Sequence, residues 1–414
     1  MSAGRGGLSR AQEELMATLR SALRGEDPAG VRGLDPALVD DVIALAESHS
    51  VTALLYGRLG SADDPRCVRA RRLVADRALT CARQLYRLTF FSADLVRSLS
   101  DAGVESVLLK GSGVAALYPV PEYRKSGDVD LLLADPSRVG LACEALRRCG
   151  LTVVGEQDAH HHVSMRSPQG IEVELHVAIT EDFDSDGLNR VVARCQAEAV
   201  RHVRTVRLLG CELPVLEDAY QALSLLLHML QHFLRAGFGL KLLCDWVEFW
   251  ARDVDPEQVD AYLRLVGACG LEGFSRVVTS ACVRRLGLEE SAAVVMLEGG
   301  RPLDERLVDD FLREVFDAGE FGRSSSERMV ALRGSSLVDV AREFHHQTRL
   351  NFPRACRCPV AWPALWAATL ARFLRNNRRV RGTTTVDVIA EARRRGDLVR
   401  RLGLFGDGAE GRLK

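Results

Sequence analysis

The stretch 107–133 reads VLLKGSGVAALYPVPEYRKSGDVDLLL. Its first apolar run ends at a glycine-serine turn, 110–113, and its second apolar run carries two carboxylates, Asp128 and Asp130. Because side chains alternate between the two faces of a strand, these carboxylates project together from the start of a strand. Ionised carboxylates repel each other, so a strand that holds two of them side by side is typical of a cation-binding site.

A β-hairpin is predicted downstream of this stretch. The turn Ser-Pro-Gln-Gly separates two candidate strands, 161–166 and 171–179. In the second strand Glu172, Glu174 and His176 share one face. Pairing of this strand with the strand that bears the two aspartates would bring a glutamate close to them. The sequence does not fix the register of that pairing.

Helical patterns flank this region on both sides. We predict helices over 9–24, 36–47, 64–100 (as one or two helices), 113–117, 136–149, 217–235 and 240–250, further helices out to 401, and strands over 104–109, 128–133 and 151–155. The predicted fold class is α+β, with a small mixed β-sheet core flanked by N- and C-terminal helical regions. The predicted domains are an N-terminal helical region (1–100), the core (101–214), a C-terminal helical region (215–405) and a flexible tail (406–414).

Composition narrows the possible partners. The 414 residues are 47% hydrophobic, so the chain can bury a sizeable core. A net charge of −1 gives no overall attraction to nucleic acid or to an anionic membrane, so local basic groups must meet any anionic substrate. Only four residues are lysine: Lys110, Lys125, Lys241 and Lys414. Almost all of the positive charge is therefore arginine, and the base composition of the gene can produce this excess of arginine over lysine.

Cysteine usage and hydropathy indicate the compartment. The eleven cysteines are scattered and odd in number, and no CxxC pair occurs, which argues against a disulfide framework and against a zinc ribbon. The first fifteen residues contain no apolar segment, and no apolar run reaches the roughly 18 residues of a membrane span. We therefore expect a cytoplasmic protein with reduced, mostly buried thiols.

Several motifs along the chain carry a family resemblance. In order, they are LLKGSG, YRKSGDVDLLL, VELHV, LLLHMLQHF and LCDWVEF. Their order resembles the uncharacterised nucleotidyltransferase family of the DNA polymerase beta-like superfamily, in which a glycine-serine turn precedes a DxD at a strand start. The likeness covers roughly 104–249. It implies that 101–214 is a nucleotidyltransferase core.

The resemblance also implies a metal site. Two Mg²⁺ ions, for which Mn²⁺ can substitute, would be bound by Asp128, Asp130 and Glu174, which are also the implied catalytic residues. Without a metal, the aspartates would be a turn cap and a solvated edge-strand residue. Glu172 is the alternative third carboxylate because it lies on the same face. His176 either orients Glu174 or simply occupies a place in the sheet.

The resemblance places the nucleotide phosphates near the glycine-serine turn. Gly111 would let the backbone approach the phosphates, and Ser112 would donate its hydroxyl or only cap the short helix that follows. Lys110 and Arg124 are candidates to neutralise the β- and γ-phosphates, and Arg124 offers a bidentate fork. Lys110 can also be read as a surface residue after a strand.

Two groups of histidines suggest a metal at first sight. Residues 160–162 are all histidine, but neighbours on a strand point to opposite faces, so we expect one of them to reach the cleft and predict no zinc site. His228 and His232 lie four apart on a predicted helix, without the glutamate of HExxH. The resemblance places this helix behind the cleft, where packing or a hydrogen bond to Asp245 is favoured over zinc.

The implied activity is Mg²⁺-dependent transfer of a nucleoside monophosphate from an NTP, with ATP as the default, to a hydroxyl or similar group, with release of pyrophosphate. The resemblance ranks a small molecule or a peptide above nucleic acid as the acceptor, because relatives of this fold modify antibiotics and proteins as well as tRNA ends, and the near-zero net charge is in keeping with that order. Two alternatives stay open. One is a toxin-like tRNA nucleotidyltransferase, and the other is a non-catalytic nucleotide-binding regulatory module.

Overall fold

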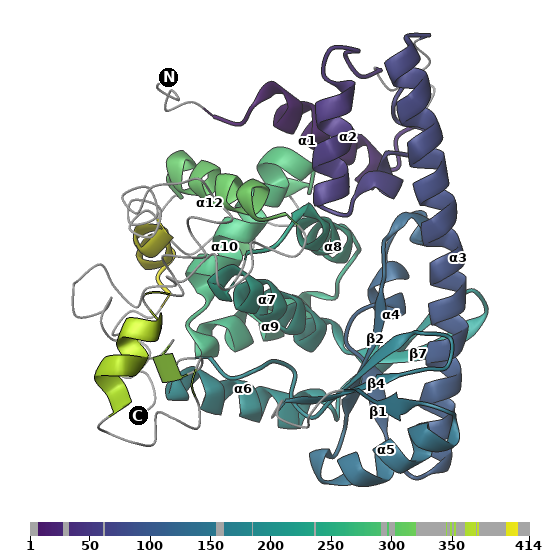
Figure 1. Ribbon diagram of the computed structural model, residues 1–414, viewed down its shortest axis with the longest axis vertical. Coiled ribbons are helices and arrows are strands. Elements are labelled where there is room, and N and C mark those ends of the chain that lie inside the picture. The colour runs from purple at the N-terminus through teal and green to yellow at the C-terminus, as the bar shows by residue number, and fades with distance from the viewer. Residues whose placement is uncertain are drawn as a thin grey trace.

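Seven strands form one mixed sheet with helices on both faces (Figure 1), which confirms the predicted α+β class. The strand order is β3-β4-β5-β2-β1-β7-β6. The strands are β1 Ser106–Leu108, β2 Asp128–Leu133, β3 Thr152–Val153, β4 His162–Arg166, β5 Glu172–His176, β6 Val203–Leu208 and β7 Cys211–Leu216. This computed structural model describes residues 7–27, 33–60, 63–154, 161–183, 185–235, 237–290, 296–297, 303–319, 345, 348–349, 352, 361–369, 371 and 395–404.

The register of the central strands brings the acidic residues together. Strand β2 pairs antiparallel with β1 and parallel with β5, and the parallel register sets Asp130 opposite Glu174. Strands β4 and β5 form the predicted antiparallel hairpin, in which Gly170 donates its backbone N–H to the Ser167 carbonyl across the turn. The sequence left the β2–β5 register open, and the structure sets Glu172 opposite Asp128 and Glu174 opposite Asp130.

The hairpin β6–β7 was not predicted. Its turn is Leu209-Gly210, and both residues have positive φ, 52° and 79°. Two-residue hairpins of this kind normally carry Asn-Gly or Asp-Gly, because a bulky residue is strained at positive φ. Leucine in the first position therefore hides the turn signal. The helix before the hairpin, α6 Asp186–Ala199, was also not predicted.

The N-terminal helices begin and end where local signals place them. Ser9 caps α1, Arg10–Leu23, in a capping box with Gln12: the Ser9 hydroxyl accepts from the Gln12 N–H, and the Gln12 side chain accepts from the Ser9 N–H. Segment 64–100 is a single helix, α3 Pro65–Asp101, which Asp64 caps. The other helices and helical turns are α2 Val39–Ser48, η2 Thr52–Leu55, α4 Ser112–Ala115, η3 Pro121–Tyr123, η4 Pro136–Arg138, α5 Val139–Arg148, α7 Asp218–Arg235, α8 Leu240–Trp250, α9 Pro256–Cys269, α10 Glu272–Ala281, η5 Cys282–Leu286 and α12 Glu305–Ala318.

Helices α3 and α5 cover one face of the sheet. Val129, Leu131 and Leu133 of β2 share an apolar cluster with Leu95 and Leu99 of α3. On the opposite face of the sheet, Leu132 belongs to a smaller cluster towards α6 and α7. The period-2 alternation of β2 therefore separates Val129, Leu131 and Leu133 from Asp128 and Asp130. One face of the sheet is core, and the other presents the carboxylates.

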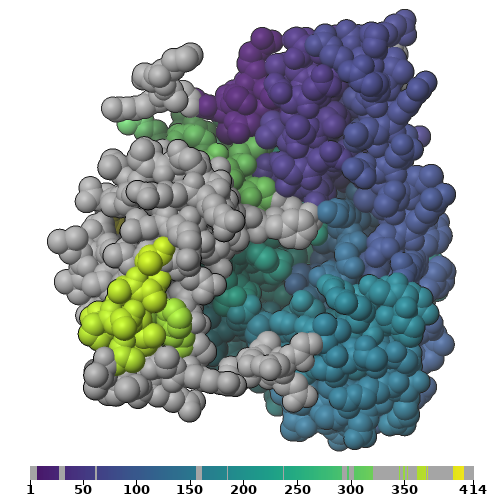
Figure 2. Space-filling view, in the orientation of Figure 1, coloured from purple at the N-terminus to yellow at the C-terminus, as the bar shows by residue number. Residues whose placement is uncertain are grey.

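The N-terminal helices share a core with the C-terminal helices. Residues of α1 and α2 belong to the same apolar cluster as residues of α7, α8, α10 and α12. In Figures 1 and 2 the purple N-terminal helices accordingly lie beside the green helix α12. The first hundred residues thus contribute to two cores, since α3 packs largely on the sheet. The domain division at residues 100 and 214 stays a prediction, and the predicted tail 406–414 lies outside the described residues.

The nine cysteines among the described residues are free thiols, and six of them are buried, as expected. Cys356 and Cys358 lie outside the described residues. Within the described part of the chain, no helix combines the length and the apolar composition needed to cross a bilayer.

Gly113 lets α4 pack closely against the sheet. A Cβ at this position would lie 2.8 Å from Cγ1 of Val215, which is closer than real Cβ contacts. We therefore expect Gly113→Ala to lower the free energy of unfolding by about 1–3 kcal/mol, as measured by denaturant titration. The loss should be smaller when Gly113→Ala is introduced into a Val215→Ala background, because the clashing methyl group is then absent.

Gly127→Ala is the matched control for this substitution. A Cβ at Gly127 would have no heavy atom within 4 Å, so the free energy of unfolding should change by less than about 0.5 kcal/mol. Equal unfolding midpoints for the Gly113→Ala and Gly127→Ala proteins would contradict the packing explanation.

Candidate functional site

A cavity of about 420 Å³ lies where the acidic face of the sheet meets α7 and α8. Its volume falls within the usual range for small-molecule pockets. Seven of the nine site residues named from the sequence line it: Lys110, Gly111, Arg124, Asp128, Asp130, Glu174 and His176. The residues that line it do not include Ser112 and Glu172. The sheet register and the turn after β1 bring most of the predicted residues together.

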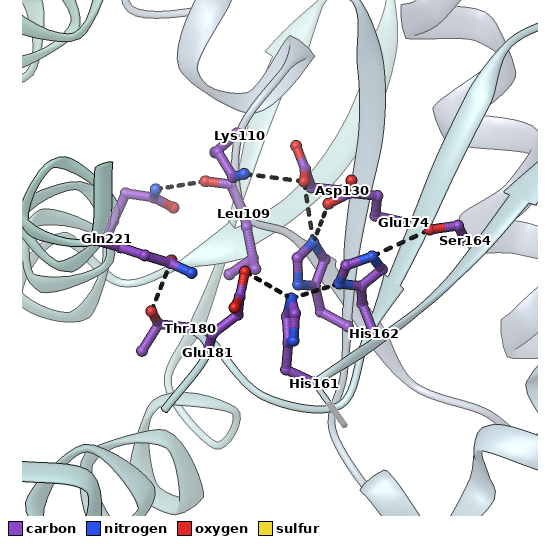
Figure 3. A network of polar contacts seen from close by, with 12 residues as sticks. Leu109, Lys110, Asp130, His161, His162, Ser164, Glu174, Thr180, Glu181 and Gln221 are labelled. Atoms are coloured by element: carbon purple, nitrogen blue, oxygen red, sulfur yellow. Dashed lines mark hydrogen bonds and ion pairs between the residues drawn. The ribbon is translucent and has the colours of Figure 1, made fainter. Parts of the chain in front are cut away.

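Asp130 is the most deeply buried acid of the site, with 1% of its surface exposed. Its Oδ1 atom is 3.0 Å from Nζ of Lys110 and 3.0 Å from Nε2 of His176 (Figure 3). The same His176 nitrogen lies 3.1 Å from Oε2 of Glu174. Oδ2 of Asp130 is also buried and has no hydrogen-bond partner. Lys110 and His176 thus both contact Oδ1 of Asp130, and Oδ2 is left available to a further ligand.

The two aspartates have opposite pKa shifts. Burial raises the pKa of Asp128, and the neighbouring Asp130 carboxylate raises it further. Burial alone would also raise the pKa of Asp130, but Lys110 and His176 outweigh it, so that pKa lies far below its usual value. The pair thus combines one carboxyl whose pKa is strongly lowered with one whose pKa is raised by its neighbour. A divalent cation would relieve the repulsion between the two acids.

The donors around the carboxylates fit a bound cation. Oδ2 of Asp130 is a buried carboxylate oxygen without a partner, which is uncommon in folded proteins and is often explained by an ion. Hard divalent cations such as Mg²⁺ prefer oxygen ligands of this kind. Asp130 and its neighbour Asp128 therefore offer oxygen ligands to such a cation, whereas the ligand atoms of Asp128, Asp130 and Glu174 do not all lie within 4.8 Å of one another.

Glu172 and Glu174 have different surroundings although they share a face of β5. The side chain of Glu172 is 63% exposed and forms an ion pair with Arg166 of the partner strand β4. Glu174 is 34% exposed, and the hydrogen bond from His176 is the main cause of its lowered pKa. The structure places Glu174 in the cavity and Glu172 outside it.

The turn after β1 approaches the carboxylates through its backbone. Gly111 has φ 60° and ψ −124°, a conformation that favours glycine, and a Cβ there would lie 3.4 Å from the Asp128 carbonyl oxygen. Ser112 is buried, and its hydroxyl accepts a hydrogen bond from Thr89 of α3. The structure therefore does not bring the Ser112 side chain to the cavity, because the side chain packs towards α3. Its predicted contact with a nucleotide stays a prediction.

Arg124 is bound to the protein itself. Its Nε and Nη2 donate to the two carboxylate oxygens of Asp245 on α8, at 2.7 and 2.8 Å, and its Nη1 donates to the Gly111 carbonyl and to Ser126. Tyr118 donates to the same Asp245 carboxylate. The bidentate fork that was predicted to hold a phosphate is thus occupied by Asp245. Arg124 instead links the glycine-serine turn to α8.

His228 and His232 lie in the cavity, and not behind it as expected. They are four residues apart on α7, and their ring centroids are 4.5 Å apart. Packing or a hydrogen bond to Asp245 was expected for them, and the carboxylate of Asp245 is bound by Tyr118 and Arg124 instead. Helix α7 passes along the cavity, so both imidazoles reach it.

His161 and His162 both line the cavity, whereas one histidine of the run was expected there. The alternation argument fails because β4 begins only at His162, so His161 belongs to the turn before the strand. Nδ1 of His162 lies 2.6 Å from Nε2 of His161 (Figure 3). His160 lies outside the described residues.

Lysine is concentrated at this cavity. Lys110, Lys125 and Lys241 line it, and these are three of the four lysines in a chain with 51 arginines, since lysine and arginine together number 55. Base composition does not explain why the remaining lysines gather at one site. Lys241 was not predicted to belong to the site. The scarcity of lysine in the sequence was the signal that could have identified it.

Known proteins were compared with the chain. A family model described as an uncharacterised nucleotidyltransferase matches residues 35–287, which is more than half of the chain and extends beyond the window 104–249. Among solved structures, an antigenic nucleotidyltransferase-like protein from Paracoccidioides brasiliensis is similar at 17% identity with a TM-score of 0.29, over 50% of this chain and 95% of that one. So low a TM-score supports no inference about activity. No curated protein matches the chain.

Glu248 of α8 lies close behind the site and is 4% exposed. Burial, and then the charge of Asp245, raise the pKa of Glu248 from 4.5 to about 8. Between these two pH values the folded state holds a proton that the unfolded state has lost, so stability falls by up to about 1.4 kcal/mol per pH unit as the pH rises. Oε1 of Glu248 also lacks a hydrogen-bond partner.

Glu248→Gln, which mimics the protonated acid, should therefore leave the melting temperature nearly unchanged at about pH 5 and raise it by about 3 °C or more at about pH 9. Differential scanning calorimetry across this range tests the expectation. Glu144→Gln, at an exposed position of α5, is the control and should show no pH-dependent gain. A Glu248→Gln gain that is equal at both pH values would contradict the burial explanation.

Proposed function

Because this chain belongs to the family of uncharacterised nucleotidyltransferases, we propose that it transfers a nucleoside monophosphate from an NTP, ATP by default, to a hydroxyl or similar group of a small molecule or peptide, and releases pyrophosphate. The single observation that carries this proposal is the β2–β5 register. It sets Asp130 beside Glu174 at a cavity that Asp128 also lines. Three carboxylates at one cavity are the ligands that nucleotidyl transfer requires for Mg²⁺.

Different residues of the cavity have different roles in the proposed reaction. Bound Mg²⁺ or Mn²⁺ would supply charge neutralisation of the triphosphate, held by Asp128, Asp130 and Glu174. Glu174 accepts a hydrogen bond from the acceptor hydroxyl and so orients it towards the α-phosphorus. His176 lies between Asp130 and Glu174 and positions both carboxylates.

Lysine side chains supply the positive charge on the phosphate side. Lys110 follows β1 and contacts Asp130, and Lys241 lies in the first turn of α8 on the same cavity. A lysine ammonium is a compact point charge, well suited to the oxygens of a departing pyrophosphate. Arg124 contributes indirectly, because its hydrogen bond to the Gly111 carbonyl fixes the turn that borders the phosphates.

The net charge of the chain supports a small-molecule or peptide acceptor. A net charge of −1 provides no broad attraction to a nucleic acid backbone. A toxin-like tRNA nucleotidyltransferase would label tRNA and arrest growth on expression. A non-catalytic regulatory module would bind NTP without releasing pyrophosphate. Each alternative is a separate outcome of the test below.

The decisive experiment incubates the protein with each α-labelled NTP, Mg²⁺ and host lysate, and identifies the species that gains label. We expect Asp128→Asn, Asp130→Asn and Glu174→Gln each to reduce labelling and pyrophosphate release by about 100-fold or more, because each removes charge that stabilises the transition state. Labelling that survives unchanged in all three variants would sink the proposed function.

Glu172→Gln is the matched control on the same strand. Its carboxylate is exposed and paired with Arg166, so labelling should stay within about twofold of wild type. A loss equal to that of Glu174→Gln would show that the exposed glutamate, not the one in the cavity, serves the reaction.

Lys241→Met should raise the KM for the NTP by about tenfold, because one charge-assisted contact to phosphate is lost. Steady-state kinetics of pyrophosphate release give KM and kcat separately. Arg207→Met is the control, since Arg207 is exposed on β6, pairs with Glu212 and is not among the residues that line the cavity. An unchanged KM in Lys241→Met would place the phosphates elsewhere.

A further inference from the structure

A second set of potential metal ligands lies on the hairpin side of the cavity. One ligand atom from each of His162, Glu174 and His176 lies within 4.8 Å of the other two. Among the described residues, no other group of three or more histidine, cysteine or acidic side chains meets this condition. Five of the ten histidines of the chain line this one cavity.

The β4–β5 hairpin fixes the three side chains on one face. His162 is paired directly with His176 across the two strands, and Glu174 precedes His176 by two residues. Directly opposed residues of an antiparallel pair have Cβ atoms about 4.5–5.5 Å apart, and residues two apart on a strand face the same way. The set is therefore held by hydrogen-bonded strands, and not by a loop that must fold around an ion.

His176 carries an unexplained nitrogen. The side chain is 5% exposed, and Nδ1 is buried without a hydrogen-bond partner. Its Nε2 lies between two carboxylates, Asp130 and Glu174, which favour a proton there. Because Nε2 faces Glu174, a cation bound by both residues would replace the proton on Nε2. Nδ1 lies across the ring from that position, so its lack of a partner leaves the ligand set itself unchanged.

His162 already has partners that would orient it. Nε2 lies 3.1 Å from the Ser164 hydroxyl, and Nδ1 lies 2.6 Å from Nε2 of His161. Binding of a cation replaces one of these contacts and leaves the other to hold the ring, which is the usual arrangement around metal-bound histidines. The surrounding contacts are compatible with ligation.

We propose that His162, Glu174 and His176 form a site for a divalent transition metal such as Zn²⁺ or Co²⁺, distinct in its donors from the oxygen site at Asp128 and Asp130. Imidazole nitrogens suit these metals, whereas Mg²⁺ binds oxygen and is held poorly by two nitrogens. Three protein ligands leave a coordination position open, as in catalytic zinc sites. The site does not require nucleotidyl transfer, although it shares Glu174 with the proposed Mg²⁺ site.

The test titrates the full-length, chelator-treated protein with Co²⁺ alone. Histidine ligands give bound Co²⁺ visible absorption, which reports binding without any enzymatic activity. We expect one strongly bound equivalent of Co²⁺, displaced by Zn²⁺ but not by excess Mg²⁺. His162→Gln and His176→Gln should each weaken Co²⁺ binding by at least about tenfold.

Two matched variants locate the site. His232→Gln removes a cavity imidazole outside the set, and Asp128→Asn removes an oxygen ligand of the proposed Mg²⁺ site, so both should keep Co²⁺ affinity within about twofold of wild type. Zn²⁺ should also raise the thermal unfolding midpoint of wild type and not that of His162→Gln, which separates lost binding from lost folding.

Several results would overturn the proposal. These are no visible Co²⁺ absorption in wild type, undiminished binding in His162→Gln, displacement by Mg²⁺, or an equal loss in His232→Gln. The outcome is separable from that of the proposed function. Co²⁺ binding with no transfer of labelled nucleotide would reject the enzyme and keep the metal site, and transfer without Co²⁺ binding would do the reverse.

Discussion

The buried carboxylate of Asp130 is the constraint on which the site depends. A charged side chain with 1% exposure is costly unless partners compensate it. Lys110 comes from the turn after β1 and His176 from β5, so the turn and both strands must keep their register to supply that compensation. A slip of one residue in β2 would turn Asp130 into the apolar cluster under α3. Charge pairing and strand register therefore stabilise each other.

A second buried ion pair ties the site to the helices. Arg124 and Asp245 are both almost fully buried and form two parallel hydrogen bonds, and Tyr118 adds a third to the same carboxylate. Losing one partner of such a pair leaves an uncompensated charge and costs about 3–5 kcal/mol. Since Arg124 also donates to the Gly111 carbonyl, movement of α8 would be transmitted to the glycine-serine turn. The strands and α8 thus act together on the cavity.

The sequence predicted the fold class, the capped helices and the β4–β5 hairpin from local signals, namely the N-cap at Ser9, the alternation of side chains in β2 and the Ser-Pro-Gln-Gly turn. Seven of the residues that line the cavity were named from the acidic pattern of the strands and from the family resemblance. Features that depend on contacts between distant parts of the chain could not be predicted from the sequence. Arg124 forms its ion pair with Asp245, which is 121 residues away in the chain, so the sequence around Arg124 does not reveal this partner. Periodicity describes one element at a time, so it cannot place the histidines of α7 in the cavity. The β6–β7 hairpin was missed because leucine occupies its first turn position.

Positive charge and nitrogen lone pairs at the cavity come from different side chains. Burial, and then the charge of Lys110, lower the pKa of His232 to about 4, and burial lowers that of His228 well below its ordinary value, so both rings are neutral near pH 7. Lysine and arginine therefore provide fixed positive charge at the cavity, while the imidazoles of His228 and His232 provide uncharged nitrogen atoms with lone pairs. Carboxylates on β2 and β5 face both kinds of group. Lysine suits anions, carboxylate oxygen suits hard cations and imidazole nitrogen suits softer ones, so the lining offers a different group to each kind of ligand.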